Sequence, residues 1–319
     1  DAAESSFQEI ADGSIKAAEA DKVEAQLRVA YFALSHGDVE EAIAAFSRIA
    51  SPDSIADVQT ATDAALRVAF LHRRAKDTAR ELGAFRQIAK KCPLRAEAAY
   101  AKLQLAGLLW EIGKGHRSQY EPLKDRVQFL KDSSVECLQI MNDPDIPYEI
   151  RLIAKLIHAE NYYFQKDYKS AIPLIEEIIS DNIDRVSDSK DIRTATYTIY
   201  NTPARQVITA MGWQAMCYYY TGDYESCISV CKEINSGSWK SSDPYRNFNV
   251  FGYAYLFEAL ANEKLGNQEL AEELHRVCRQ KYPSWYDGIG VSKMRKMGLE
   301  PPMIDFSMMP ENSISQGGR

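Results

Sequence analysis

The chain of 319 residues is 45% hydrophobic and 26% charged, with a formal net charge of -7. These proportions are ordinary for a folded globular protein. The acidic balance disfavours nucleic-acid binding, which requires a basic surface that replaces the counterions of the phosphates. No apolar run approaches the roughly 18 residues of a membrane-spanning helix. We therefore expect a folded protein with no nucleic-acid partner and no transmembrane segment.

Helical periodicity dominates the start of the chain. Apolar residues at helical spacing predict an amphipathic lead-in helix over 4–18 and a second helix over about 22–36. Gly37 is a favourable end for the second helix because glycine adopts the left-handed cap conformation at low cost. Asp38 suits the N-cap of a third helix, which is expected to end near Ser51. The second and third helices therefore predict a helical hairpin.

The same pattern of a helix end, a polar turn and a helix start occurs four times in the sequence. The four turns contain Gly37-Asp38, Lys166-Asp167, Gly222-Asp223 and Gly266-Asn267. A small side chain follows each cap by four residues, and another small side chain lies twelve residues before that one. The pairs are Ala30 and Ala42, Ala159 and Ala171, Ala215 and Cys227, and Ala259 and Ala271. Small side chains let helix axes approach closely, so each pair predicts a helix crossing.

Two further units follow the pattern loosely. In the first, Ala75-Lys76-Asp77 replaces the glycine turn. In the next, a helix rich in Ala and Leu runs from Arg95 to about 113–115, and a short helix is expected to start at Ser133. The chain therefore has about six hairpins, of which the clear ones span 22–51, 148–180, 204–235 and 247–281.

An insertion and a tail depart from the helical pattern. Residues 181–203 are polar and rich in turn formers, while 194–200 alternate with a period of two and are β-branched. We interpret this insertion as a long packed loop, because a lone strand has no partner there. The tail 301–319 begins with two prolines and stays apolar to about residue 310. We expect it to lie across the protein's own surface or a neighbour's groove.

These features resemble the tetratricopeptide repeat (TPR) family. Its motif is a helix–turn–helix of about 34 residues with small residues at the helix crossing and often a closing proline, a place held here by Pro93 and Pro283. The resemblance implies an all-α fold, an α-α superhelix or TPR-like solenoid with irregular insertions. It also implies one repeat domain over 1–300 and a separate tail over 301–319. In style the chain is similar to exported bacterial TPR proteins and lipoproteins.

In this family the first helices of the hairpins line a concave groove. Mapping that face gives Arg73 and a predicted binding surface of Tyr31, Phe70, Glu160, Tyr163, Phe164, Met216, Tyr219, Tyr220, Tyr253 and Leu256. Tyrosine combines a large contact area with a polar tip, so a peptide or helix of a partner suits this groove. The alternative is that the rings fill contacts between helices. The Lys and Asn with which one subfamily clamps acidic chaperone tails are absent, since Leu27 and Tyr31 stand at those positions.

No motif indicates chemistry. The five histidines lack metal-ligand spacing, and no phosphate loop or hydrolase motif occurs. The six cysteines are interpreted as small buried residues, although Cys217 could approach Cys227 or Cys231. We therefore expect no catalytic residue, metal or cofactor.

The sequence thus favours a non-enzymatic scaffold that binds a protein or peptide partner through the aromatic groove. One alternative is a binding subunit for a small ligand or glycan on the same groove, and another is an enzyme with an unfamiliar site. The chain opens at Asp1 without an initiator Met, as expected after removal of a leader. A periplasmic or outer-membrane-anchored protein of the bacterial cell envelope is expected, with a cytoplasmic location as the alternative. No pattern indicates the identity of the partner, the pathway or the oligomeric state.

Overall fold

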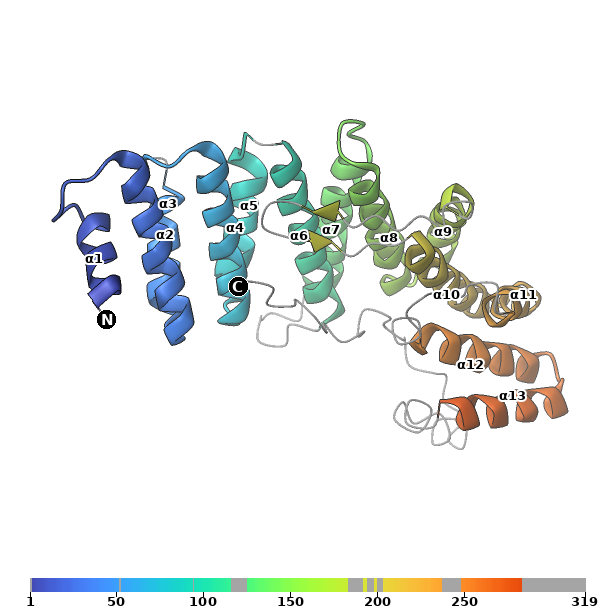
Figure 1. Cartoon of the computed structure of the whole chain (residues 1–319). Helices are drawn as coiled ribbons and strands as arrows, with labels where there is room; N and C mark the ends of the chain where they lie inside the picture. The colour runs from blue at the N-terminus through green and yellow to red at the C-terminus, as the bar shows by residue number, and fades with distance from the viewer. Residues whose placement is uncertain are drawn as a thin grey trace. The chain divides into compact units, whose positions relative to one another are not determined.

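The computed structural model describes residues 2–51, 53–93, 95–115, 125–182, 192–193, 198–199, 203–236 and 248–282. These residues form thirteen helices and one pair of short strands (Figure 1). The chain divides into two compact units. The first comprises Asp1–Ile157 and Arg193–Thr198, and the second His158–Ile192 and Ile199–Arg319. The single repeat domain over 1–300 stays a prediction, and the tail 301–319 lies outside the described residues.

The first unit is a row of antiparallel helices, each packed on the next from α1 to α7. The helices are α1 (Ala2–Ala11), α2 (Glu19–His36), α3 (Val39–Ile49), α4 (Val58–Arg74), α5 (Thr78–Lys91), α6 (Arg95–Lys114), α7 (Arg126–Met141) and the first part of α8 (Tyr148–Phe164). One of its cores lies between α2, α3 and α4, where Phe46 and Ile49 are completely buried. The apolar faces predicted from helical spacing therefore meet one another.

The second unit continues the same architecture. It contains the end of α8, then α9 (Tyr168–Asn182), α10 (Pro203–Thr221), α11 (Tyr224–Asn235), α12 (Phe248–Lys264) and α13 (Gln268–Lys281). From α9 to α13 each helix packs on the next, and α10 also packs on α12. Trp213 and Tyr163 are its largest completely buried side chains.

The insertion between α9 and α10 contains the strands β1 (Ile192–Arg193) and β2 (Thr198–Ile199), which pair with each other. The prediction of an extended segment is confirmed at β2. The prediction that it would find no partner is wrong, because the partner strand lies only a few residues earlier in the same segment.

Five hairpins share one turn geometry. The residue before each cap has a positive φ: 83° at Gly37, 59° at Lys76, 63° at Lys166, 84° at Gly222 and 82° at Gly266. Its N–H donates to the carbonyl three residues back and the next N–H to the carbonyl five residues back, as in Gly222 N to Tyr219 O (3.1 Å) and Asp223 N to Tyr218 O (2.9 Å). This is the hydrogen-bond pattern of a Schellman cap. The loosely matching turn at Lys76 therefore has the same geometry as the glycine turns.

The residue after the positive φ starts the next helix. Asp38, Asp77, Asp167 and Asp223 each accept a hydrogen bond from the backbone N–H three residues on, at 2.9–3.3 Å. Asn267 instead donates its side-chain amide to Asn262 Oδ1 at 3.0 Å. Four of the five caps thus satisfy an N–H group that a helix start leaves without an intrahelical partner.

The small side chains at the predicted helix crossings are buried, as the prediction requires. All eight side chains of the four small-residue pairs are at most 2% exposed. The hairpin of α4 and α5 departs from this rule. There Ala69 takes the first small position, but Glu81 takes the second, and its side chain is completely buried.

Two predicted helix boundaries are wrong. The lead-in helix ends at Ala11 rather than residue 18, because Gly13 turns the backbone at φ 85° and Asp12 Oδ1 accepts a hydrogen bond from Ser14 N. Ser133 does not start a helix but lies inside α7, where its buried hydroxyl donates to Ala106 O at 2.8 Å. That bond ties α7 to α6.

Alanine substitutions at two glycines should change stability in opposite directions. Gly222→Ala should lower the free energy of unfolding by about 1 kcal/mol, because a side chain disfavours the left-handed conformation although no atom lies within 4 Å of the new Cβ. Gly83→Ala, on the exposed face of α5, should raise it by about 0.5–1 kcal/mol through helix propensity. Urea unfolding measures both values. Changes of the same sign would contradict the turn geometry.

Ala171→Leu should overpack the crossing of α8 and α9 and lower the free energy of unfolding by about 1–3 kcal/mol. Lys169→Leu, on the exposed side of α9, serves as the control and should change stability little. Thermal unfolding compares the two variants. An unchanged midpoint for Ala171→Leu would show that the two helices do not cross there.

Candidate functional site

Two hairpins of the first unit carry the same pair of aromatic rings. Tyr31 of α2 meets Phe46 of α3 edge to face, with centroids 5.6 Å apart at 87°. In the next hairpin, Phe70 of α4 meets Phe85 of α5 at 5.4 Å and 80°. Phe46 and Phe85 are completely buried, Phe70 is half-buried, and Tyr31 is 42% exposed. Each hairpin thus anchors one ring in the core and holds a second ring at the surface.

An arginine covers each ring pair. The Arg67 Cζ lies 5.1 Å from the centroid of Tyr31 and 5.8 Å from that of Phe46. The Arg73 Cζ lies 5.1 Å from Phe70 and 5.6 Å from Phe85. These distances are those of cation–π interactions. The arginine of the first pair comes from the following hairpin, whereas that of the second comes from the same helix as Phe70.

These side chains belong to three helices of the first unit, α2, α4 and α6, whose course can be followed in Figure 1. We call this set the α2–α4–α6 face and define it by Tyr31, Arg67, Phe70, Arg73 and Gln104. Contacts join these helices in order. Arg67 of α4 lies over the Tyr31 ring of α2, and the ring centroids of Phe70 in α4 and Tyr100 in α6 are 6.5 Å apart.

The two arginines of this face have different electrostatic surroundings. Arg73 Nε donates to Glu81 Oε1 at 2.5 Å, and Arg73 Nη2 donates to Gln104 Oε1 at 3.2 Å. The buried Glu81 carboxylate is thereby paired, as a buried charge must be. The Arg67 guanidinium, in contrast, makes no hydrogen bond or ion pair within the part of the chain that the structure describes.

Aromatic residues of the second unit form a repeated module at the hairpin turns. Tyr163 contacts Phe164, Tyr168 and Trp213, with centroid distances of 5.3, 5.5 and 4.5 Å. In the next hairpin, Tyr219 contacts Tyr220, Tyr224 and Phe257 at 5.4, 5.7 and 5.3 Å. The stacked rings of Tyr168 and Tyr220 join the modules at 5.1 Å. These rings connect successive hairpins, in agreement with the alternative interpretation that the rings fill contacts between helices.

Six of the ten residues predicted to line a groove are buried. They are Tyr163, Met216 and Leu256, at 0% exposure, and Tyr219, Glu160 and Tyr253, at 4–7%. These side chains pack inside the fold and offer almost no surface to a ligand, which corrects the prediction for them. Tyr31, Phe70, Phe164 and Tyr220 keep exposed area, so their groove role stays a prediction.

The sequence prediction omits Arg67 and Gln104. Both belong to the α2–α4–α6 face through contacts with other helices, so no local spacing marks them. The sequence does contain one weak signal for Arg67 as a surface residue of this face. Arg67 lies one turn before the aromatic residue Phe70 on the same helix.

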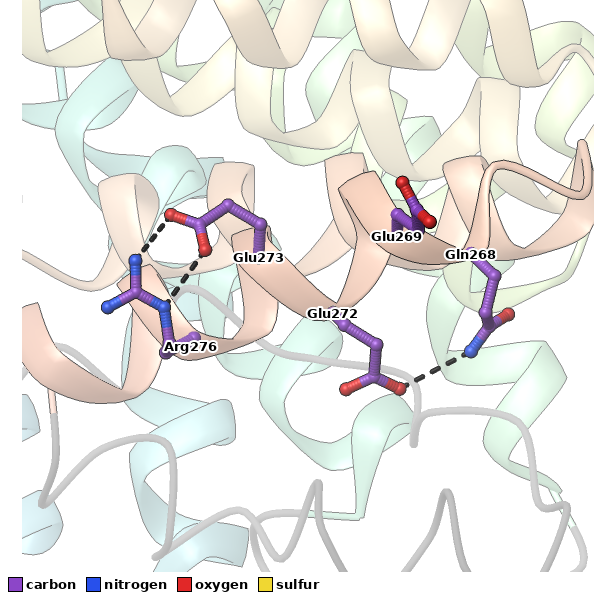
Figure 2. A pocket seen from close by; sticks show the side chains of 5 residues that line it. All are labelled: Gln268, Glu269, Glu272, Glu273 and Arg276. Atoms are coloured by element: carbon purple, nitrogen blue, oxygen red, sulfur yellow. Dashed lines mark hydrogen bonds and ion pairs between the residues drawn. The ribbon is translucent and has the colours of Figure 1, made fainter.

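A shallow depression on α13 offers no enclosed site. Figure 2 shows the five side chains that line it, Gln268, Glu269, Glu272, Glu273 and Arg276. Arg276 donates to both carboxylate oxygens of Glu273 at 2.9 and 2.5 Å, and Gln268 Nε2 donates to Glu272 Oε1 at 3.3 Å. Most of these polar groups satisfy one another along one exposed helix face.

No three His, Cys, Asp or Glu residues in the described ranges gather closely enough to hold a metal ion. None of the six cysteines forms a disulfide in the described structure, and burial raises the pKa of Cys217 to about 12, so its thiol stays protonated. Within the same ranges, every helix is too short or too polar to cross a membrane.

The recurring turn and the buried small pairs identify the architecture. Five hairpins share the positive-φ turn, and four of them bury a small residue on each helix where the helices cross. The fold is a tetratricopeptide-like array of helical hairpins. No protein-family model matches the chain, and no curated protein sequence matches it significantly.

Solved structures with a similar arrangement of helices are remote in sequence. The apo form of RapI is 11% identical, with a TM-score of 0.48 over 82% of this chain and 77% of that one. A tetratricopeptide repeat protein from Parabacteroides merdae is 10% identical, with a TM-score of 0.36 over 82% and 93%. The TPR2AB domain of yeast Sti1, in a complex with pHSP90, is 12% identical, with a TM-score of 0.32 over 86% and 96%. The tetratricopeptide-like assignment therefore rests on the hairpins themselves.

Stability should depend on pH through His158 of α8. Its ring is 4% exposed and packs on Tyr162 at 4.9 Å, and burial lowers its pKa below the ordinary 6.5. Since the unfolded chain takes up this proton at higher pH than the folded chain, the stability present above about pH 6.5 is lost as the pH falls. His158→Gln should therefore lose less stability than the unaltered chain between about pH 7 and pH 5.

Urea unfolding of both proteins at the two pH values measures this difference, in which the shifts of other groups cancel. An identical loss for His158→Gln and the unaltered chain would contradict a buried neutral imidazole.

Proposed function

We propose that this protein is a non-enzymatic scaffold that binds a segment of a partner protein on the α2–α4–α6 face. The position of Tyr31 is the observation that carries this proposal. Its ring is fixed by Phe46 and Arg67, yet 42% of the residue remains exposed. A rigid aromatic surface loses little conformational entropy on binding, which is why tyrosine and arginine are enriched among the residues that dominate binding energies.

The chemistry of the neighbouring residues supports a peptide ligand. Phe70 adds a half-buried ring, while Arg73 and Gln104 add polar atoms that are already held in place by hydrogen bonds. Apolar surface with a few ordered polar groups suits a chain that presents both side chains and backbone amides. The face draws on the first helices of three successive hairpins, which favours an extended segment or a helix over a compact small molecule.

We also propose that the protein acts in a bacterial cell envelope. This part of the proposal rests on the resemblance of the sequence to exported TPR proteins. Fractionation of the source cells, followed by detection of the chain with a specific antibody, tests it. Recovery only in the cytosolic fraction would refute the envelope location and leave the binding proposal intact.

The binding proposal predicts that Tyr31→Ala loses the partner. The purified chain serves as bait for envelope and soluble fractions of the source organism, and mass spectrometry identifies the captured proteins. Affinity for a captured partner, measured with purified proteins, should fall about tenfold or more, because truncating a central aromatic residue costs at least about 1.4 kcal/mol of binding energy.

Tyr218→Ala of the second unit is the matched control. Its hydroxyl donates to Glu176 at the surface, outside the α2–α4–α6 face, so the partner should still bind. Thermal unfolding of both variants confirms that they are folded. Equal binding by all three proteins would refute this face as the site. The absence of any protein partner, together with a stabilising small molecule or glycan in a thermal-shift screen, would favour the alternative ligand class.

A further inference from the structure

The two arginine–aromatic clusters of the first unit have equivalent ring pairs, but their arginines differ in origin and in charge pairing. Tyr31 and Phe46 occupy the same places relative to the cap Asp38 as Phe70 and Phe85 do relative to Asp77. Both ring pairs have the same edge-to-face geometry, and an arginine lies over each, from the following hairpin in the first cluster and from the same helix in the second. The surroundings of the two arginines can therefore be compared over the same kind of ring pair.

The second cluster contains its own carboxylate, whereas the first does not. Glu81 pairs with Arg73 from the second small position of its hairpin. The corresponding residue of the first hairpin is Ala42, which has no polar side chain. Arg67 thus lies on its rings without the acid that neutralises Arg73.

Neither Asp63 nor Glu24 supplies this missing carboxylate to Arg67. Asp63, one turn earlier on α4, accepts a hydrogen bond from Gln59 Nε2 at 3.3 Å and makes no described contact with Arg67. Glu24 of α2 pairs with Arg28 at 2.8 Å. Among the described residues, the polar edge of the half-buried Arg67 guanidinium therefore remains available to an external acceptor.

The rings hold this guanidinium in place while its donors stay without a hydrogen bond among the described residues. The Arg67 Cζ lies 5.1 Å from the centroid of Tyr31 and 5.8 Å from that of Phe46, within the range of cation–π interactions. Two parallel N–H groups match the two oxygens of a carboxylate, and such charge-assisted pairs are stronger than neutral hydrogen bonds. Because the rings already restrict the side chain, less freedom is lost when the pair forms.

We propose that Arg67 binds a side-chain carboxylate of an acidic partner segment, with the rest of that residue resting on the exposed Tyr31 ring. This inference rests on the proposed binding of a protein segment and specifies its chemistry. Arg67 would pair with a carboxylate of the partner, as Arg73 pairs with the Glu81 carboxylate within the fold.

The test follows the side-chain Nε–Hε signal of Arg67 by NMR in the nitrogen-15-labelled chain, with the signal assigned from its loss in Arg67→Gln. The probes are capped hexaglutamate and, as the neutral match, capped hexaglutamine. The signal should shift and saturate with hexaglutamate and stay in place with hexaglutamine. Binding of hexaglutamate, followed on backbone signals of α2 and α4, should weaken about tenfold in Arg67→Gln, as expected for loss of a charge-assisted pair.

Arg28→Gln is the matched control, because Arg28 takes the position of Arg67 in the preceding hairpin and is exposed and paired with Glu24. It should bind hexaglutamate like the unaltered chain. Arg67→Lys keeps the charge but not the planar fork, so it should show an intermediate affinity. Thermal unfolding of the three variants shows whether each is folded.

Three results would overturn the inference: no shift of the Arg67 signal, an equal shift with hexaglutamine, or an equal shift with inorganic phosphate, which would indicate a general anion site. The partner captured by the bait separates this inference from the proposed function. A partner lost with Tyr31→Ala but retained by Arg67→Gln would leave the binding face valid and refute the carboxylate contact. A partner retained by both variants would refute both.

Discussion

Close contact between paired helices is the constraint on which the rest of this structure depends. In four hairpins a methyl- or thiol-sized side chain stands on each helix at the crossing, and all eight are buried. The positive-φ turn fixes where the second helix begins, and the cap four residues before the small side chain fixes its register. Once both are set, larger side chains near the crossing have only two directions available, into the core or out to the surface.

The hairpin of α4 and α5 shows what happens when the crossing rule is broken. Glu81 places a carboxylate where the other hairpins have a small apolar side chain, and a buried carboxylate is costly without a partner. Arg73 of α4 supplies the compensating charge, and Gln104 of α6 in turn accepts a hydrogen bond from Arg73. The exchange at one buried position therefore determines the arrangement of two polar groups at the surface.

Aromatic residues have different structural roles in the two units. In the second unit, Tyr163 and Tyr219 join the turn of one hairpin to the first helix of the next, and both are buried. In the first unit, Tyr31 remains exposed because its hairpin already has Phe46 in the core. A count of aromatic residues in the sequence points to the second unit, whereas exposed area points to the first.

The sequence predicted the parts of the fold that depend on neighbouring residues. Hairpin positions, caps and crossings follow from local spacing, and the described helices agree with them at Gly37, Asp223 and Ala171. The site could not be predicted in the same way. Helical periodicity shows that Tyr163 is on an apolar face but not that Trp213 covers it, and no local pattern places Arg67 over Tyr31. Both contacts join residues that are far apart in the chain.

The Glu81 contacts have a consequence for the modular character of the array. Repeat proteins whose hairpins touch only through a standard apolar interface can exchange, duplicate or lose units with little penalty. Here Arg73 of the second hairpin donates a hydrogen bond to Gln104 of the third hairpin. Arg67 of the second hairpin also lies over the ring pair of the first hairpin. Exchange or loss of any one of these three hairpins would therefore break at least one of these contacts, so the hairpins of this part of the chain are not equivalent to interchangeable repeats.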